Sequence, residues 1–361
     1  MANIIMAVYN SIQNDARVIR AAEALNKDGH KITVLSCNSD VNFSNPAFES
    51  IVYSYPMKGF RLLLHFWFFV WKWLKTYKKD YDIIYMHDYF MPIIGAFSSK
   101  ILKKRWIYDA HELLIQRSKH KKSKRELFFF ILEKFSAPKA DLVIAANDER
   151  LRIIKRIYKL SNIVSVGNIS NLDIRKMNDN PDDIIVYQGI LNEERRPDLY
   201  IKVLKFLPEH IKLKLIGGGN IDYYKNLSKD LGLSDRVIFT GKIPYKDLIG
   251  ESQKCKVGIV SYLMNDLNNL YCSPNKLFEY IQFGLPIIAS PQPFLKQVIK
   301  KYNLGEIWDC RKDTLEDLAE KILSIINNYD IYRVKMAEFN HAYTSEKEMK
   351  KLSDAVDAIT V

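Results

Sequence analysis

The chain has 361 residues, of which 48% are hydrophobic and 27% are charged, a globular composition that excludes a disordered or fibrous protein. The length suits two domains better than one. Lys and Arg (54) outnumber Asp and Glu (42), and the whole excess lies in residues 1–180, with 29 basic and 17 acidic side chains against 25 of each in residues 181–361. The first half is therefore expected to face a negatively charged partner.

Short β-branched segments alternate with segments of helical periodicity in the first half of the chain. Strands are predicted at 3–8, 31–36, 51–55, 82–86, 105–108, 141–145 and 163–166. Helices are predicted between them at 15–27, 61–78, 91–103, 124–137 and 148–160. This alternation is typical of a parallel sheet with helices on both faces.

A segment rich in Asn and Asp then interrupts the pattern, and 171–183 is predicted to be a linker. The alternation resumes with strands at 184–188, 212–216, 237–240, 257–260 and 286–289. Helices are expected at 198–206, 220–231, 274–283, 293–301 and 314–327, followed by a long helical segment at 331–357. We therefore expect two doubly wound Rossmann-like α/β domains, 1–170 and 184–335, with ligands bound in a cleft between them at the strands' carboxyl ends.

The four cysteines lie far apart, with no Cys-x-x-Cys pair: Cys37, Cys255, Cys272 and Cys310. Neither a disulfide framework nor a structural zinc is expected, and a reducing cytoplasm is the default. Residues 1–9 are apolar but lack the basic flank of a secretory signal. The longest apolar run, 62–71, is about half of the roughly 20 residues that a membrane span needs. We expect a protein that does not cross a bilayer.

The most informative motif begins the predicted helix at 274. Ser273 is suited to the N-cap and Pro274 to the first helical position, so that the backbone amides around Asn275 offer a site for an anion such as a diphosphate. Lys276 lies in the first turn, where a cation opposes the helix dipole, which suggests that it meets an external negative charge. Glu279 is placed to accept hydrogen bonds from a vicinal diol such as a ribose. The alternative is a capped amphipathic helix with a solvated lysine and glutamate.

Two glycine-containing loops follow strands of the second half. Gly189 ends one strand before a loop that carries Arg195 and its neighbour Arg196, whose planar side chains suit phosphate oxygens. These arginines are equally compatible with a surface pair bridged to neighbouring glutamates. Gly218, central in a glycine triplet, would let the backbone approach a ligand closely, although a tight turn explains the triplet as well.

Polar residues also follow strands of the first half. His111 comes directly after the strand at 105–108, between two carboxylates, where it is able to hydrogen-bond a sugar and support developing positive charge. His87 ends the preceding strand in the same way, and for it we favour a satisfied loop residue. Asp15 caps the first helix, with Arg17 available for an acceptor or another anionic ligand.

Together these motifs resemble glycosyltransferase family 4, the retaining nucleotide-sugar-dependent enzymes of the GT-B fold. The similarity runs over essentially the whole chain, through 15–18, 29–35, 108–112, 187–189 and 215–219, and is strongest over 274–280. The resemblance implies that Arg195 and Lys276 bind the diphosphate of a nucleoside-diphosphate sugar and Glu279 its ribose. It also implies that His111 reaches the transferred sugar and that a final helix, 336–361, crosses back to the first domain.

One position departs from the family pattern. The family usually has a second glutamate eight residues before position 279, near the reacting sugar, and this chain has Tyr271 there. The sugar-contacting residue on that side is therefore unassigned. The resemblance implies front-face attack without a protein nucleophile. No Asp-x-Asp follows a strand, so we predict no metal and no cofactor besides the sugar donor.

Two segments account for the positive charge of the first half. In 59–79, basic residues including Lys72 form a helical stripe beside an aromatic surface that includes Trp67 and Trp71. In 117–135, a basic cluster precedes an aromatic run: Lys121, Lys122, Lys124, Arg125 and Phe128. This composition is typical of helices that lie in a membrane interface, although for 59–79 a buried helix with lysines at its edge is an equal alternative. We expect peripheral binding to the inner, anionic face of the cytoplasmic membrane and a lipid-linked saccharide acceptor.

Three other functions fit parts of the sequence. A nucleotide-sugar epimerase of the GT-B fold would use the same diphosphate site without an acceptor. A nucleic-acid-binding protein would suit the pI of about 9.2, but no RNA- or DNA-binding motif is present and aromatic runs interrupt the basic residues, so we expect no nucleic acid partner. A non-catalytic membrane scaffold would explain Tyr271 in place of the usual carboxylate.

Overall fold

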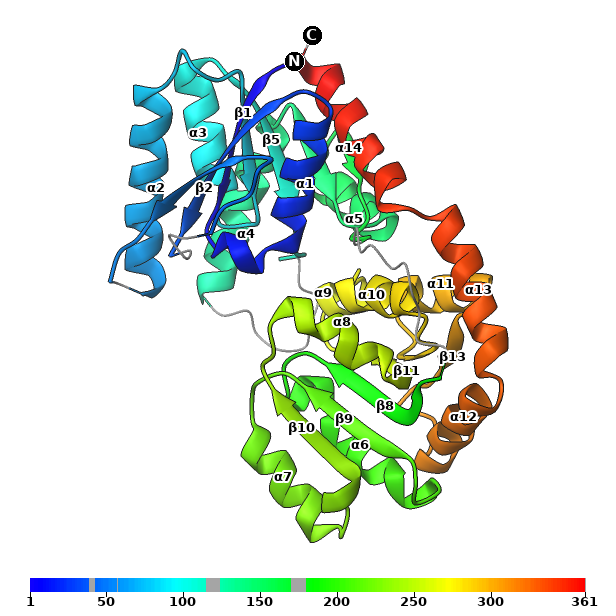
Figure 1. The fold of residues 1–361 in the computed structure, drawn as a ribbon. Helices are drawn as coiled ribbons and strands as arrows, with labels where there is room; N and C mark the ends of the chain where they lie inside the picture. The colour runs from blue at the N-terminus through cyan, green and yellow to red at the C-terminus, as the bar shows by residue number, and fades with distance from the viewer. Residues whose placement is uncertain (39–42, 57, 115–123, 170–179, 361) are drawn as a thin grey trace. The chain divides into compact units, whose positions relative to one another are not determined.

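The computed structural model describes residues 1–38, 43–56, 58–114, 124–169 and 180–360. The chain forms two compact units. The N-terminal unit combines Met1–Asn171 with Ser345–Val361, and the C-terminal unit comprises Leu172–Thr344. Each unit is built on one parallel sheet with helices on both faces, which confirms the predicted fold class (Figure 1).

The N-terminal unit contains a seven-stranded sheet in the order β3-β2-β1-β4-β5-β6-β7. Its strands are β1 (Asn3–Val8), β2 (Lys31–Cys37), β3 (Glu49–Tyr53), β4 (Ile83–His87), β5 (Arg105–Ala110), β6 (Leu142–Ala145) and β7 (Ile163–Ser165). All neighbouring pairs are parallel. The central strands are apolar along nearly their whole length because helices cover both of their faces.

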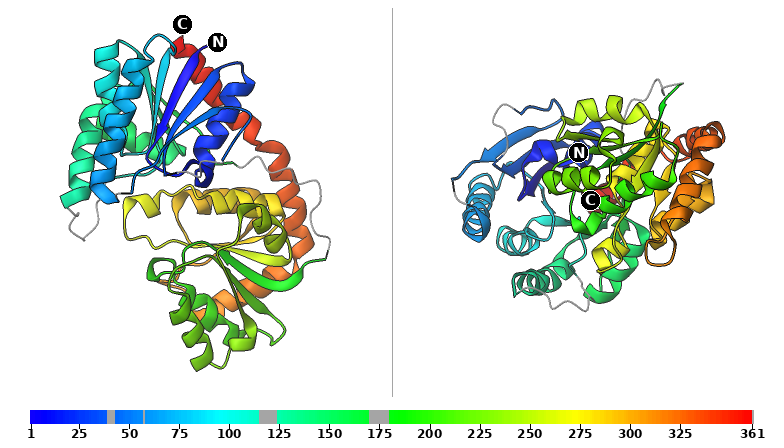
Figure 2. Two further views of the ribbon diagram at one scale, coloured as in Figure 1. Left: turned by 60° about the vertical axis from the view of Figure 1, so that its left-hand side comes forward. Right: turned by 90° about the horizontal axis from the view of Figure 1, so that it is seen from below.

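Two groups of helices cover this sheet. Helices α1 (Ala16–Lys27) and α14 (Ser345–Thr360) lie side by side on one face, where Val18, Ala22 and Leu25 share a core with Leu352 and Val356 (Figure 2). Helices α2 (Gly59–Thr76), α3 (Pro92–Leu102) and α4 (Lys124–Ser136) lie beside one another on the other face. Helix α5 (Asp148–Tyr158) packs on β6 and β7.

The C-terminal unit contains a six-stranded sheet in the order β10-β9-β8-β11-β12-β13. Its strands are β8 (Asp182–Gln188), β9 (Lys212–Ile216), β10 (Val237–Gly241), β11 (Cys255–Val260), β12 (Ile287–Ala289) and β13 (Gly305–Ile307). Its helices are α6 (Pro197–Val203), α7 (Ile221–Asp230), α8 (Tyr245–Gln253), α9 (Leu267–Leu270), α10 (Asn275–Phe283), α11 (Pro293–Tyr302), α12 (Leu315–Asn327) and α13 (Tyr329–Ala342). The strand order reverses between β8 and β11, the position at which doubly wound folds bind ligands.

Four features differ from the sequence prediction. Strand β13 and helices α8 and α9 were not predicted, because three residues at a sheet edge and short helices give little periodicity. The segment predicted as one helix at 331–357 is two helices, α13 and α14, separated by Tyr343 and Thr344. The boundary between the two units falls at this break, at Thr344, and α14 belongs to the N-terminal unit.

Candidate functional site

The carboxyl ends of β8 and β11 and the start of α10 bring two cations together in the C-terminal unit. The Nζ atom of Lys276, in the first turn of α10, lies 4.4 Å from the ring centre of Tyr187 and 5.3 Å from that of Tyr262. The guanidinium carbon of Arg195 lies 4.1 Å from the same Tyr262 ring, and its Nη1 donates to Asn269 Oδ1 at 3.3 Å. The two cations therefore converge on one aromatic cluster.

This cluster has the electrostatics of an anion-binding site. Lys276 is partly buried and forms no ion pair within the described part of the chain. Burial and the neighbouring Arg195 lower the pKa of Lys276 to about 7, although Glu279 acts in the opposite direction. Two cations held close together without a counter-ion are unfavourable unless an anion joins them. The backbone amides and the positive end of the dipole at the start of α10 also favour a bound anion.

Glu279 lies one turn further along α10, with 5% of its surface exposed. Its Oε2 accepts a hydrogen bond from the Gln188 side chain at the end of β8. The backbone N–H of Gln188 also donates to the Tyr280 hydroxyl at 3.0 Å. These bonds fix the end of β8 to α10 and hold the Glu279 carboxylate in one orientation.

The start of α10 differs by one residue from the prediction. Pro274, not Ser273, is the N-cap, with φ −74° and ψ 136°, and Asn275 is the first helical residue. A proline has a suitable φ for either position, so its ψ decides where the helix begins. Ser273 is buried immediately before the cap, and Asn275 is exposed.

The glycine loops pack against each other. A Cβ at Gly217 would lie 1.9 Å from the Gly189 carbonyl oxygen, and one at Gly219 would lie 2.3 Å from the Leu191 oxygen. Both residues have positive φ, at 139° and 126°. Gly218, the position predicted to contact the donor, accepts a hydrogen bond from Leu191 N through its carbonyl oxygen, and the atoms nearest to its added Cβ belong to the Lys242 side chain. Glycines at 217 and 219 are thus required for close contact between two backbones.

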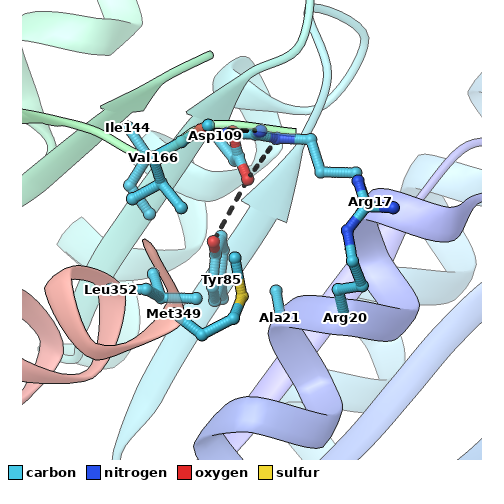
Figure 3. A pocket seen from close by; sticks show the side chains of 10 residues that line it. Arg17, Arg20, Ala21, Tyr85, Asp109, Ile144, Val166, Met349 and Leu352 are labelled. Atoms are coloured by element: carbon cyan, nitrogen blue, oxygen red, sulfur yellow. Dashed lines mark hydrogen bonds and ion pairs between the residues drawn. The ribbon is translucent and has the colours of Figure 1, made fainter. Parts of the chain in front are cut away.

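In the N-terminal unit, a buried ion pair lies at the end of β5. The Arg17 Nη2 is 2.8 Å from Asp109 Oδ1, its Nε contacts both Asp109 oxygens, and the Tyr85 hydroxyl donates to Oδ2 at 3.2 Å (Figure 3). Burial would raise the pKa of Asp109, but Arg17 and two histidines outweigh it and hold that pKa far below its usual range. Asp109 is therefore ionised at neutral pH.

The predicted availability of Arg17 for an anionic ligand is wrong. Besides Asp109, its guanidinium donates through Nη1 to Val166 O at 3.1 Å and to Asn168 Oδ1 at 2.6 Å. Only 11% of its side chain is exposed. Asp15 is the N-cap of α1, and its side chain accepts from Val18 N at 3.3 Å.

His111 lies beside this ion pair and close to a second histidine. Its Nε2 is 3.3 Å from His87 Nδ1 and 3.9 Å from Asp109 Oδ2. Burial lowers the pKa of His111 to about 4, although Asp109 acts in the opposite direction, so the imidazole is neutral at pH 7. The Arg150 side chain donates a hydrogen bond to the His111 carbonyl oxygen through Nη1. The structure thus fixes His111 at the carboxyl end of β5 with 15% of its side chain exposed.

The side chains of His87, Asp109 and His111 lie within metal-ligand reach, since one nitrogen or oxygen of each lies within 4.8 Å of the others. However, Asp109 Oδ2 already accepts from Arg17 and Tyr85. The guanidinium supplies the positive charge that a metal ion would otherwise provide. This competition favours a hydrogen-bonded cluster over a metal centre.

Two family models together match nearly the whole chain. The model described as "Glycosyltransferase Family 4" matches residues 16–171, and that described as "Glycosyl transferases group 1" matches residues 169–342. An uncharacterized glycosyltransferase of Methanocaldococcus jannaschii is 22% identical over 354 residues, covering 86% of this chain and 87% of that protein. The chain is a glycosyltransferase of the GT-B type.

Solved structures of similar fold include several glycosyltransferases. HepE of Anabaena in complex with UDP is 15% identical with a TM-score of 0.72, covering 99% of this chain and 100% of the other. TarM of S. aureus is 12% identical with a TM-score of 0.70, covering 98% and 99%. The lipopolysaccharide outer core galactosyltransferase WaaB is 17% identical with a TM-score of 0.65, covering 99% of both chains. At these identities the similarity establishes the fold.

The aromatic residues predicted to face a membrane occupy two different environments in this glycosyltransferase. Trp67 and Trp71 are partly buried, since Trp67 Nε1 donates to Phe90 O at 2.9 Å and the Trp71 ring packs on Phe97. Phe128 is 43% exposed. Both tryptophans therefore pack against other residues of the N-terminal unit.

Other apolar side chains of α2, α3 and α4 are exposed and form what we call the apolar face: Phe60, Leu64, Phe68, Phe97, Ile101, Leu127, Phe128, Ile131 and Phe135. The Phe60 and Phe128 rings contact each other, which connects α2 to α4. Exposed cations accompany them on α2 and α4, among them Lys72, Lys124 and Arg125. Lys121 and Lys122 lie outside the described residues. Within the described part of the glycosyltransferase, none of the helices has the length and apolar content needed to span a bilayer.

Proposed function

We propose that this glycosyltransferase moves a hexosyl group from a nucleoside-diphosphate sugar to a lipid-linked saccharide in cell-surface polysaccharide synthesis. The diphosphate binds between Lys276 and Arg195 at the start of α10, and Glu279 accepts hydrogen bonds from the ribose. The bond from the anomeric carbon to the phosphate oxygen breaks, the acceptor hydroxyl attacks from the same face with retention, and its proton passes to the departing phosphate oxygen. The cations stabilise the departing diphosphate.

The observation that carries this proposal is the convergence of Lys276 and Arg195 on Tyr262 without an ion-pair partner for Lys276 in the described residues. Similar structures add support, because HepE was solved with UDP, UDP-glucose, and UDP with glucose. WaaB is a lipopolysaccharide outer core galactosyltransferase and TarM was solved with α-GlcNAc-glycerol, which fits an acceptor of the cell surface.

A melting assay with nucleotides tests the donor site without knowledge of the acceptor. At a hundredfold excess over Kd, UDP or GDP should raise Tm by about 5–10 °C, and the corresponding monophosphates should raise it less. Arg195→Ala should remove most of this difference. Arg196→Ala is a matched control, because the neighbouring arginine is already paired with Asp198 at 2.9 Å. Equal shifts for diphosphates and monophosphates in the wild type would contradict the proposal.

We further propose that the apolar face lies on the anionic inner surface of the cytoplasmic membrane, which brings a lipid-linked acceptor to the enzyme. Phe135 is 65% exposed and Phe68 is 67% exposed. Such exposure of large apolar side chains is unfavourable in water unless another surface covers them. Each nearby cation adds about 1 kcal/mol of attraction to an anionic leaflet. A helix face with this composition is favoured at an interface between water and lipid.

Vesicle flotation tests this surface with a matched pair of variants. Phe128 on α4 and Phe206 in the C-terminal unit are each 43% exposed. Phe128→Asp should weaken binding to vesicles that contain phosphatidylglycerol, whereas Phe206→Asp should not. Binding should also decrease at high salt and with neutral phosphatidylcholine vesicles. Equal loss in both variants, or no wild-type binding at low salt, would refute membrane docking.

A further inference from the structure

His87 is a fully buried polar residue at the end of β4, with no exposed surface. Its backbone pairs in register with Asp109 on β5 and Val8 on β1. Its ring stacks on that of Tyr85, with centres 4.3 Å apart and planes 18° from parallel. The imidazole therefore has one orientation, fixed from both sides of the strand.

The two ring nitrogens of His87 have different surroundings. Nε2 is buried and has no hydrogen-bond partner among the described residues. Nδ1 lies 3.3 Å from His111 Nε2 and 3.6 Å from Asp109 Oδ2. A buried N–H without an acceptor is more costly than a buried lone pair without a donor, and the nearby carboxylate attracts a proton to Nδ1. Both effects place the His87 proton on Nδ1.

This assignment determines the tautomer of the second imidazole. With the proton on His87 Nδ1, the 3.3 Å contact is a hydrogen bond in which His87 donates and His111 Nε2 accepts. The neutral His111 ring then carries its own proton on Nδ1. His111 keeps 15% of its side chain exposed, so part of the ring is accessible to a ligand.

We infer that His87 is a positioning residue that locks His111 as a neutral hydrogen-bond donor through Nδ1, directed at an oxygen acceptor of the substrate. The identity of this oxygen rests on the proposed function, under which it belongs to the transferred sugar. In this tautomer, His111 Nε2 is occupied and cannot serve as a general base. His111 thus supports the reaction by hydrogen-bond donation.

Two-bond nitrogen–proton NMR spectra of the imidazole rings test the inference in the unliganded protein at pH 7, with His111→Gln to assign the signals. We expect Nδ1 protonated and Nε2 unprotonated for His111 in the wild type. In His87→Leu the proton should shift largely to Nε2. His87→Asn, whose amide N–H lies near the former Nδ1, should restore the wild-type pattern. A wild-type His111 protonated on Nε2, or no change in His87→Leu, would overturn the inference.

Kinetics provide a second readout. His87→Leu should lower kcat by about 10–100-fold with the donor KM changed less than about threefold, and His87→Asn should recover most of the loss. Stoichiometric Zn²⁺ binding that His87→Leu abolishes would also overturn the inference, because both nitrogens of the 3.3 Å contact would then be metal ligands. The NMR result requires no transferase activity, so a failed proposed function and a failed tautomer assignment are distinguishable.

Discussion

Lys276 should take up a proton when a nucleoside diphosphate binds. In the unliganded protein, burial and Arg195 lower its pKa from 10.5 to about 7. A diphosphate beside Nζ would stabilise the charged form and raise this pKa again. Because the protonated form binds the anion, affinity is complete below pH 7 and decreases as the pH rises through the pKa of the free protein.

The expected size of the uptake follows from that value. A group with a pKa of about 7 in the free protein that stays fully charged in the complex takes up about 0.1 proton at pH 6, about 0.5 at pH 7 and about 0.9 at pH 8. Above pH 8 the affinity should fall by about tenfold per pH unit. Without ligand, the unfolded chain binds more protons than the folded one between pH 7 and 10.5, so the stability penalty of Lys276 decreases as the pH rises through this window.

Calorimetry in buffers of different ionisation enthalpy measures this uptake directly. Lys276→Arg is the matched control, since a guanidinium keeps the charge at every pH used and should retain UDP affinity within about tenfold. The ionisation of UDP itself contributes equally in both proteins and cancels in the comparison. The same uptake in Lys276→Arg as in the wild type, or an uptake that is constant from pH 6 to pH 8, would refute the assignment of the proton to Lys276.

Three further experiments with substitutions test other parts of the structure. Arg17→Ala should cost about 3–5 kcal/mol of unfolding free energy in urea titrations, because it leaves the Asp109 charge buried without its guanidinium. Adding Asp109→Asn should recover part of this loss, and additive losses for the two substitutions would contradict the ion pair. Gly217→Ala should cost at least about 2 kcal/mol, and Gly218→Ala less than about 1 kcal/mol; equal costs would contradict the backbone contact. Phe135→Ser should leave thermal stability nearly unchanged and weaken vesicle flotation, and a large loss of Tm would indicate a structural role for this ring instead.

The sequence was sufficient for the sheet architecture because buried parallel strands are continuous apolar segments between turn residues. It also singled out Lys276, since a lysine in the first turn of a helix conflicts with local electrostatics whatever the fold, and the binding of a diphosphate by Lys276 stays a prediction. The aromatic partners of Lys276 could not be predicted. Tyr187 lies near the end of a buried strand, where an aromatic residue usually belongs to the core, and Tyr262 lies in the loop after β11, more than 70 residues later.

Arg17 and His87 show why partners distant in sequence escape prediction. Arg17 pairs with Asp109 across 92 residues, a contact that depends on the placement of α1 beside β5. His87 was interpreted as a satisfied loop residue, but β4 extends to it and aligns it with Asp109. A signal was present in the sequence, because His87 lies at the end of one predicted strand and Asp109 at the end of the next. Parallel register brings the ends of neighbouring strands together, and so brings these two residues together.

The structure of a UDP complex would show where the diphosphate binds. We predict that its diphosphate oxygens lie within hydrogen-bond distance of Lys276 Nζ and the Arg195 guanidinium, at the first turn of α10. A diphosphate bound away from this turn, with Lys276 and Arg195 unchanged over the tyrosine rings, would contradict it.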